Sequence, residues 1–267
     1  MDKRPIGLMD SGLGGLSVTR VLRQQMPAES VVFVGDQGHY PYGTKQQSQI
    51  QQLALAIGEF LVRQDVKLMI IACNTATAAA LPLLQAKLPI PVIGVVQPGA
   101  QAAVKRGGRR IGVIGTESTI NHQAYKQALN KLAPDLTVVS KATQPLVGLV
   151  EHGLTRTSKA QQVVNTELKI FDQQPVDTLI LGCTHFPFLQ TEIGTKLGPA
   201  VQLVDPAYET ISQAQQLLAQ HQQLAPTSQQ PAIKLYSTGN QADLVQGAAK
   251  WLPYGYDSCE HLELGED

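Results

Sequence analysis

Two cysteines with matching neighbours are the residues of this chain best suited to chemistry. Cys73 ends the segment Ile70-Ile71-Ala72-Cys73, and Cys183 ends the segment Ile180-Leu181-Gly182-Cys183. Continuous apolar runs of this kind are typical of buried strands in parallel sheets, and ligand sites gather beyond the carboxyl ends of such strands. The chain therefore carries two equivalent thiols at equivalent edges, and a matched pair suggests a reaction with two equivalent ends.

The residues that follow the cysteines favour acid–base chemistry, although each motif also has a structural interpretation. A helical pattern begins soon after Cys73, and a helix N-terminus favours a thiolate. Asn74 and Thr75 can bind a polar ligand or cap that helix. In an extended backbone His185 points to the same side as Cys183, so its imidazole can act as acid, base or charge partner. A buried, capped cysteine and a structural histidine are the alternatives.

A loop rich in small residues follows the first apolar run. It reads Asp10-Ser11-Gly12-Leu13-Gly14-Gly15. Small residues let a ligand approach the backbone, and the helix that follows offers N–H groups to an anion such as a carboxylate. Ser17 stands where a dinucleotide fingerprint has glycine, so this loop is not that fingerprint. Asp10 either caps the helix or recognises an amino group.

Three further places hold candidate site residues. Thr116 and Thr119 stand in the second half of the chain where the Asp10 loop stands in the first, and they can cap a helix or bind a carboxylate. Glu151 lies near a turn, where a solvated surface position is the simpler interpretation. Pro41-Tyr42-Gly43 has the composition of an ordinary turn.

Composition excludes several classes of protein. The 267 residues include 21 basic and 21 acidic ones, and no long basic run gives a reason to expect binding to nucleic acid or an anionic membrane. No apolar stretch approaches the roughly 18 to 20 residues that span a bilayer, and no signal peptide is evident, so we expect a cytoplasmic protein. Three cysteines do not form a disulfide framework or a zinc site, and Cys259 in the acidic tail is expected to be a bystander.

Apolar runs alternate with helical periodicity along the chain, which is typical of parallel α/β sheets. Strands are expected at residues 6–9, 31–34, 68–72, 92–95, 111–114, 137–139, 178–181, 202–204 and 233–236. Helices are expected at 15–25, 48–64, 77–86, 98–105, 119–132, 159–171 and 208–220, with a further helical stretch ending at Trp251.

An internal repeat relates the two halves of the chain. The segment beginning at Ile6 resembles the one beginning at Ile111, 105 residues later, and Cys183 follows Cys73 by 110 residues. Landmarks in the same order at nearly constant spacing predict two similar α/β domains. We place the first at residues 1–97 with 207–267, the last segment returning to it, and the second at residues 98–206.

Taken together, these motifs resemble the bacterial glutamate racemases of the aspartate/glutamate racemase superfamily. The resemblance covers essentially the whole chain and rests on Asp10 to Gly15, Pro41 to Gly43, Cys73 to Ala76, Gly115 to Thr119, Glu151, Gly182 to His185, and Thr238 with Gly239. It implies two α/β domains with mainly parallel sheets, related by pseudo-two-fold symmetry, with the active site between them.

The resemblance also implies a reaction, which is cofactor-independent interconversion of L- and D-glutamate that supplies D-glutamate for peptidoglycan. Cys73 would deprotonate the D-substrate and Cys183 the L-substrate, assisted by Asp10 and His185 respectively, with Glu151 as auxiliary acid. No metal, flavin or pyridoxal phosphate is needed, and the enzyme is expected to be a homodimer. The implied substrate-binding residues are Asp10, Ser11, Pro41, Tyr42, Gly43, Asn74, Thr75, Thr116, Thr119, Thr184 and His185.

Three other functions compete with this interpretation. A racemase acting on aspartate or another amino acid is the nearest, because pocket size cannot be measured from sequence. Cys183 and His185 could instead be nucleophile and base of an amide or ester hydrolase, which leaves Cys73 without a function. A non-catalytic amino-acid-binding protein would need neither thiol.

Overall fold

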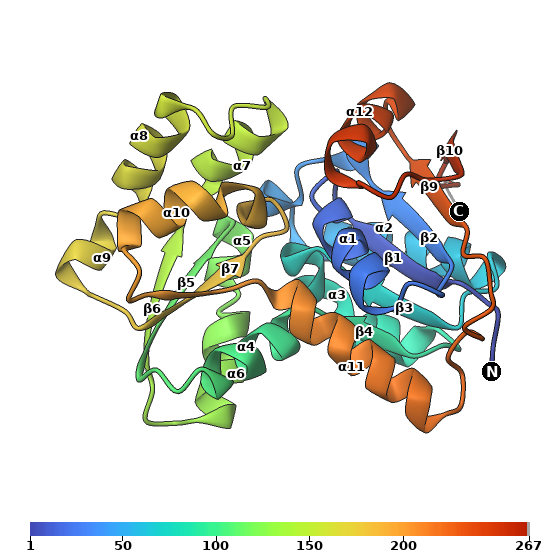
Figure 1. The fold of residues 1–267 in the computed structure, drawn as a ribbon, viewed down its shortest axis with the longest axis horizontal. Coiled ribbons are helices and arrows are strands. Elements are labelled where there is room, and N and C mark those ends of the chain that lie inside the picture. Colours follow the sequence, from blue (N-terminus) through green and yellow to red (C-terminus); the bar gives the residue numbers. More distant parts are fainter. Residues whose placement is uncertain (266–267) are drawn as a thin grey trace.

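The computed structural model describes residues 1–265, which form two parallel sheets covered by helices (Figure 1). One sheet has six strands in the order β10-β9-β2-β1-β3-β4, and the other has four in the order β6-β5-β7-β8. All of their described strand pairs are parallel. The strands are β1 (Ile6–Asp10), β2 (Val31–Gly35), β3 (Leu68–Ile71), β4 (Val92–Gly94), β5 (Arg110–Gly115), β6 (Thr137–Ala142), β7 (Thr178–Gly182), β8 (Gln202–Val204), β9 (Ile233–Ser237) and β10 (Ser258–His261).

Both sheets contain the same arrangement of four strands. The first strand of each unit lies between the second and the third, and the fourth flanks the third, as β2-β1-β3-β4 and as β6-β5-β7-β8. This repeated order confirms the prediction of two similar α/β units with parallel sheets. It places Cys73 and Cys183 just beyond the equivalent strands β3 and β7, while Asp10 and Gly115 end the equivalent strands β1 and β5.

Helices occupy most of the connections between strands. They are α1 (Leu16–Gln25), α2 (Gln47–Arg63), α3 (Asn74–Lys87), α4 (Val96–Lys105), α5 (Glu117–Asn121), α6 (Ala124–Leu132), α7 (Gln144–Glu151), α8 (Ser158–Glu167), α9 (Ile170–Gln173), α10 (Gln190–Leu197), α11 (Pro206–Gln220) and α12 (Gln241–Trp251), with 3₁₀ turns η1 (Gln37–His39), η2 (Tyr42–Thr44) and η3 (Phe186–Leu189). Helices α4 and α11, which follow β4 and β8, pack against each other and so bring together the two connections between the sheets.

The structure corrects several predicted elements. The helix expected at 119–132 is two helices, because the His122 ring bonds to the carbonyl of Ser118 and Gln123 adopts a left-handed φ of 52°. The helix expected at 159–171 ends at 167 and is followed by the short α9. Helices α7 and α10 and strand β10 were not expected, and Cys259, placed by the sequence in the acidic tail, lies half-buried in β10.

The domain boundaries at 97/98 and 206/207 stay a prediction. Strands of the six-stranded sheet come from residues 6–94 and 233–261, and those of the four-stranded sheet from 110–204. Residues 266 and 267, the end of the predicted first domain and of the acidic tail, lie outside the described residues. Within residues 1–265, no helix combines the length and the apolar character needed to cross a membrane.

A buried ion pair anchors the start of β3, the strand that leads to Cys73. Lys67 Nζ lies 2.6 Å from Glu29 Oε2, with 0% and 3% of the two side chains exposed. The same ammonium donates hydrogen bonds of 2.8 Å to the carbonyl oxygens of Asp2 and Gln223. It therefore joins the N-terminal segment, the α1–β2 connection, β3 and the segment after α11.

We expect Lys67→Met to lower the free energy of unfolding by about 3–5 kcal/mol, because the variant leaves the Glu29 carboxylate buried without its cation. Urea denaturation measures this, with Lys234→Met at an exposed position of β9 as the control. The double variant Lys67→Met/Glu29→Met should recover much of the loss. A loss below about 1 kcal/mol in the single variant would show that the pair is not an anchor.

Candidate active site

A small cavity of about 20 Å³ brings together residues from the carboxyl ends of both sheets. Both thiols line it, with 5% of Cys73 and 7% of Cys183 exposed. The full lining is Ser11, Tyr40, Pro41, Tyr42, Gly43, Cys73, Asn74, Thr75, Thr116, Gln144, Val147, Gly182, Cys183, Thr184 and His185. The cavity holds about one water molecule, so it must widen to admit a ligand the size of an amino acid.

Three predicted site residues stand directly behind this lining. Asp10 accepts a hydrogen bond from Thr184, Thr119 bonds to Thr75 and Thr116, and Glu151 bonds to His185. The structure thus brings every predicted site residue to one place. Tyr40, Gln144, Val147 and Gly182 also line the cavity and were not predicted as site residues.

Cys73 is the N-cap of α3 and is held as a neutral thiol. Its sulfur accepts the N–H of Ala76 at 3.4 Å, and its S–H donates to Ser11 Oγ at 3.6 Å. Burial raises the pKa of this thiol to about 12, and the nearby Asp10 carboxylate acts in the same direction, while the N–H of Ala76 and the hydroxyl of Ser11, which can donate to a thiolate, oppose it. Near neutral pH Cys73 is therefore protonated in this conformation.

Cys183 lies beside a charged imidazole. Its sulfur is 3.5 Å from His185 Nδ1, and His185 Nε2 bonds to Glu151 Oε1. Burial disfavours the charged ring, but the hydrogen bonds to Cys183 and Glu151 outweigh it and raise the pKa of His185 to about 10. An imidazolium therefore faces Cys183 and stabilises negative charge on the sulfur.

The predicted contact between Cys183 and His185 is confirmed, but the extended backbone invoked for it is wrong. His185 has φ −78° and ψ −29° and is the N-cap of η3. The chain turns immediately after the strand, and this turn brings the imidazole back towards the sulfur. Tyr40 packs near the same ring, with the ring centroids 6.4 Å apart.

Asp10 is a fully buried carboxyl group at the end of β1. It accepts the N–H of Gly12 at 3.1 Å and the hydroxyl of Thr184 at 3.2 Å. Burial raises the pKa of Asp10 to about 6, and the opposing influences include His185 and the backbone N–H groups of Gly12 and Gly15. The N-cap of α1 is Gly15, so Asp10 does not cap that helix.

Hydroxyl and amide groups cross between the two halves at the base of the cavity. Thr75 Oγ1 lies 2.9 Å from Thr116 Oγ1 and 3.2 Å from Thr119 Oγ1. Asn74 Oδ1 accepts a hydrogen bond of 2.6 Å from the hydroxyl of Tyr125. Because these polar groups satisfy one another, a ligand must replace some of their bonds to use them.

The carboxylate of Asp36, which precedes the loop that carries Tyr42, fixes that loop. The Tyr42 hydroxyl donates to Asp36 Oδ2 at 2.5 Å, and Asp36 Oδ1 accepts from Thr238 at 2.5 Å and bonds to His39 at 2.7 Å. Thr238 follows β9, so the returning C-terminal segment supports this wall. The shared support explains why the Pro41 to Gly43 turn and the Thr238 motif belong to the same site.

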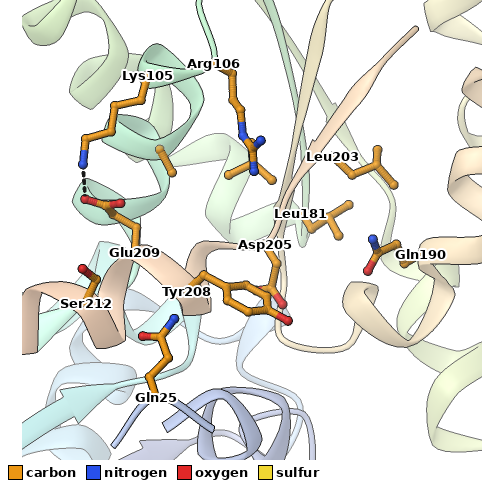
Figure 2. A pocket seen from close by; sticks show the side chains of 12 residues that line it. Gln25, Lys105, Arg106, Leu181, Gln190, Leu203, Asp205, Tyr208, Glu209 and Ser212 are labelled. Atoms are coloured by element: carbon orange, nitrogen blue, oxygen red, sulfur yellow. Dashed lines mark hydrogen bonds and ion pairs between the residues drawn. The ribbon is translucent and has the colours of Figure 1, made fainter. Parts of the chain in front are cut away.

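The molecule has cavities larger than the one lined by the two thiols, but size alone does not identify an active site. Figure 2 shows a cavity of about 620 Å³ that includes Arg106, Asp205 and Tyr208 in its lining. Lys105 and Glu209 form an ion pair of 2.6 Å across part of it (Figure 2). None of the predicted site residues lines this cavity.

Comparison with known proteins places the chain in a family. The model of the Asp/Glu/Hydantoin racemase family matches residues 6–214. The chain belongs to this family, and it is therefore an isomerase. The match over most of the chain establishes this class of enzyme. It agrees with the presence of paired thiols at the ends of equivalent strands.

Particular relatives are more specific than the family. The glutamate racemase of Limosilactobacillus reuteri is 66% identical over 267 residues, which is 100% of both chains. Among solved structures, a glutamate racemase isoform of Bacillus anthracis has a TM-score of 0.94 and 38% identity, covering 99% of each chain. The glutamate racemase of Francisella tularensis, solved in complex with D-glutamate, has a TM-score of 0.92 and 33% identity over 100% of each chain.

We expect Gly14→Ala to lower racemase activity roughly 100-fold, because small displacements at reacting groups have effects of that order. A Cβ at Gly14 would lie 2.3 Å from Thr184 Oγ1 and 2.7 Å from His185 Nδ1, so these side chains must move. Steady-state kinetics measure the loss. In the control Gly148→Ala, the added carbon meets only His152, at 3.9 Å, and activity should persist. Equal activities in the two variants would contradict the close approach at Gly14.

Asp10→Asn should gain stability relative to the unmodified protein as pH rises. Because burial raises the Asp10 pKa from 3.8 to about 6, its ionisation destabilises the fold, with a cost absent below pH 3.8 and complete above about pH 6. The difference in unfolding free energy should shift by about 1–2 kcal/mol in favour of the variant between about pH 5 and about pH 8. Chemical denaturation at both pH values tests this, with Asp135→Asn at an exposed position as control. A pH-independent difference would contradict the raised pKa.

Proposed function

We propose that this protein interconverts L- and D-glutamate by proton transfer between Cys73, Cys183 and the substrate α-carbon. The observation that carries the proposal is that the two thiols line one cavity from the ends of equivalent strands in two similar sheets. The names of the relatives and the D-glutamate bound to the Francisella tularensis enzyme support glutamate as the substrate. Racemisation removes a proton from one face of a carbon and delivers one to the other, which two opposed acid–base groups accomplish.

The unequal environments of the thiols define the starting state for L-glutamate. The Cys183 thiolate, stabilised by the His185 imidazolium, takes the α-proton, so a C–H bond breaks and an S–H bond forms. The electron pair left on the α-carbon then accepts the proton of the neutral Cys73 thiol on the opposite face, which completes D-glutamate. Cys73 ends as the thiolate, and the reverse reaction of D-glutamate begins from that state.

Polar groups around the cavity are suited to hold an amino acid during this transfer. Ser11, Asn74, Thr75 and Thr116 can donate hydrogen bonds to the substrate carboxylates, which stabilises the charge that develops as the α-proton leaves. Asp10 can attract the substrate ammonium through the hydroxyl of Thr184. The proton donors and acceptors that the proposal requires all come from side chains, so it includes no cofactor.

The Glu151–His185 pair has a positioning function in this proposal. Glu151 bonds to the ring nitrogen remote from Cys183, which fixes the orientation of the imidazole and favours its charged form. A widening of the cavity must precede substrate binding, because the present volume suits about one water. The supply of D-glutamate for peptidoglycan, the cytoplasmic location, the homodimer and the two domain boundaries remain predictions from the sequence and the family resemblance.

A cysteine hydrolase is the second candidate that the geometry favours. Cys183, His185 and Glu151 are linked in the order nucleophile, base and orienting acid. Hydrolysis would leave Cys73 without a role, although this thiol lines the same cavity. The two functions therefore differ in what they require of Cys73.

Incubation with L-glutamate in deuterated water tests the two-thiol reaction. We expect D-glutamate to form with deuterium at the α-carbon, followed by NMR for the label and polarimetry for configuration. Cys73→Ser and Cys183→Ser should each lower racemisation at least about 1000-fold, because a hydroxyl is a far weaker acid than a thiol at this position. Cys259→Ser, in β10 and outside the cavity, is the matched control and should retain activity.

Two results would overturn the proposal. Absence of both α-deuterium and the D-enantiomer with the unmodified protein would exclude glutamate racemisation. Full activity of Cys73→Ser would exclude the two-thiol mechanism, and amide or ester hydrolysis by that variant would favour the hydrolase.

A further inference from the structure

A second kind of site lies on the outer side of the junction between the two halves. A cavity of about 870 Å³ is lined by residues from α1, the α7–α8 loop, η3, α10 and the end of α12. Figure 1 shows α12 on one side of this junction and α7 with α10 on the other. It shares no lining residue with the cavity of the two thiols. We infer that this outer cavity binds a small multivalent anion, carrying phosphate or several carboxylate groups.

The charges of the outer cavity have one sign. Its ionisable lining residues are Arg20, Arg156 and Lys250, and its lining includes no Asp or Glu. Among the described residues 1–265, none of these cations forms an ion pair. The chain as a whole has a net charge of zero, so this excess is local. Positively charged side chains gathered in a concave surface focus the electric field and attract anions.

Two of the cations are held by a pair of stacked aromatic rings. Phe188 stacks on Trp251 with ring centroids 4.2 Å apart and an interplanar angle of 20°. The Arg20 guanidinium lies 5.8 Å from the Phe188 centroid, and Lys250 Nζ lies 5.7 Å from the Trp251 centroid. Cation–π attraction therefore favours these positions of both side chains before any ligand arrives, which lowers the entropy lost on binding.

The third cation stands on a constrained loop. Arg156 has a left-handed φ of 62°, and its backbone N–H donates a 2.5 Å hydrogen bond to Oε1 of the buried Glu192. The Glu192 carboxylate thereby fixes the loop without lining the cavity. Arginine binds phosphate and carboxylate groups through two parallel N–H bonds, so Arg20 and Arg156 suit both kinds of anion. The volume lies within the range of about 300–1,000 Å³ that is usual for small-molecule sites.

The outer cavity adjoins segments that carry residues of the thiol site. Gly153 lies two residues after Glu151, and Pro187 lies two residues after His185, so the lining includes the segments that follow both members of this hydrogen-bonded pair. An anion bound there would bridge the two halves and oppose the widening that substrate binding requires. This regulatory effect rests on the proposed function, whereas the binding of the anion does not.

Isothermal titration calorimetry on the intact protein tests the inference, with tripolyphosphate and citrate as separate probes at low ionic strength. We expect saturable one-to-one binding that weakens as salt is added. Arg156→Gln and Lys250→Gln should each weaken it about tenfold, as expected for loss of one charged hydrogen-bond donor. Arg63→Gln, at the exposed end of α2, makes the same change of charge elsewhere and should leave binding unchanged.

The outcomes separate the alternatives. Binding of tripolyphosphate alone identifies a phosphate ligand, binding of citrate alone a polycarboxylate, and binding of both the shared anion chemistry. No saturable binding of either probe, or equal weakening by Arg63→Gln, would overturn the inference. Thermal unfolding of each variant shows whether it is folded. If the protein binds the anion but does not racemise glutamate, the anion site is supported and the proposed function is contradicted.

Discussion

The hydrogen bond from Thr184 to Asp10 joins the two halves of the molecule inside the site. Asp10 ends the central strand β1 of one sheet, and Thr184 follows strand β7 of the other. The contact forms only because Gly14 has no side chain, since any Cβ there would occupy the place of Thr184 and His185. A fully buried carboxylate and a glycine loop thus meet where the carboxyl ends of both sheets face one cavity.

The topological repeat gives the two thiols equivalent positions, but their surroundings differ. Cys73 is capped by a backbone N–H and faces the buried Asp10, so it is neutral. Cys183 faces a cationic imidazole that Glu151 holds from the far side. A pair of proton-transfer groups must contain one acid and one base at any moment. In the proposed reaction, the unequal charges beside the two thiols would supply that difference, although the strands that carry the thiols are alike.

Sequence alone predicted the parts of this structure whose signals are local. Strands β3 and β7 are buried on both faces. Their continuous apolar runs made it possible to identify both cysteines as residues at strand ends. Strand β10 is a polar edge strand without such a pattern, and α7 and α10 are helices of only eight residues each, so none of the three was recognised. The bond between Glu151 and His185 spans 34 residues and depends on where α7 packs. Gln144 and Val147 lie on the same helix, and they were missed for the same reason.

The support of Tyr42 by Thr238 has a consequence for biosynthesis. A chain emerging from the ribosome folds from its N-terminus, and domains generally form as units. Here the loop bearing Tyr42 is held through Asp36 by Thr238, a residue 202 positions after Asp36. Strand β9, which inserts between β2 and β10, also arrives late. The nascent chain can therefore carry both cysteines before the segment that supports this wall of the cavity has been synthesised.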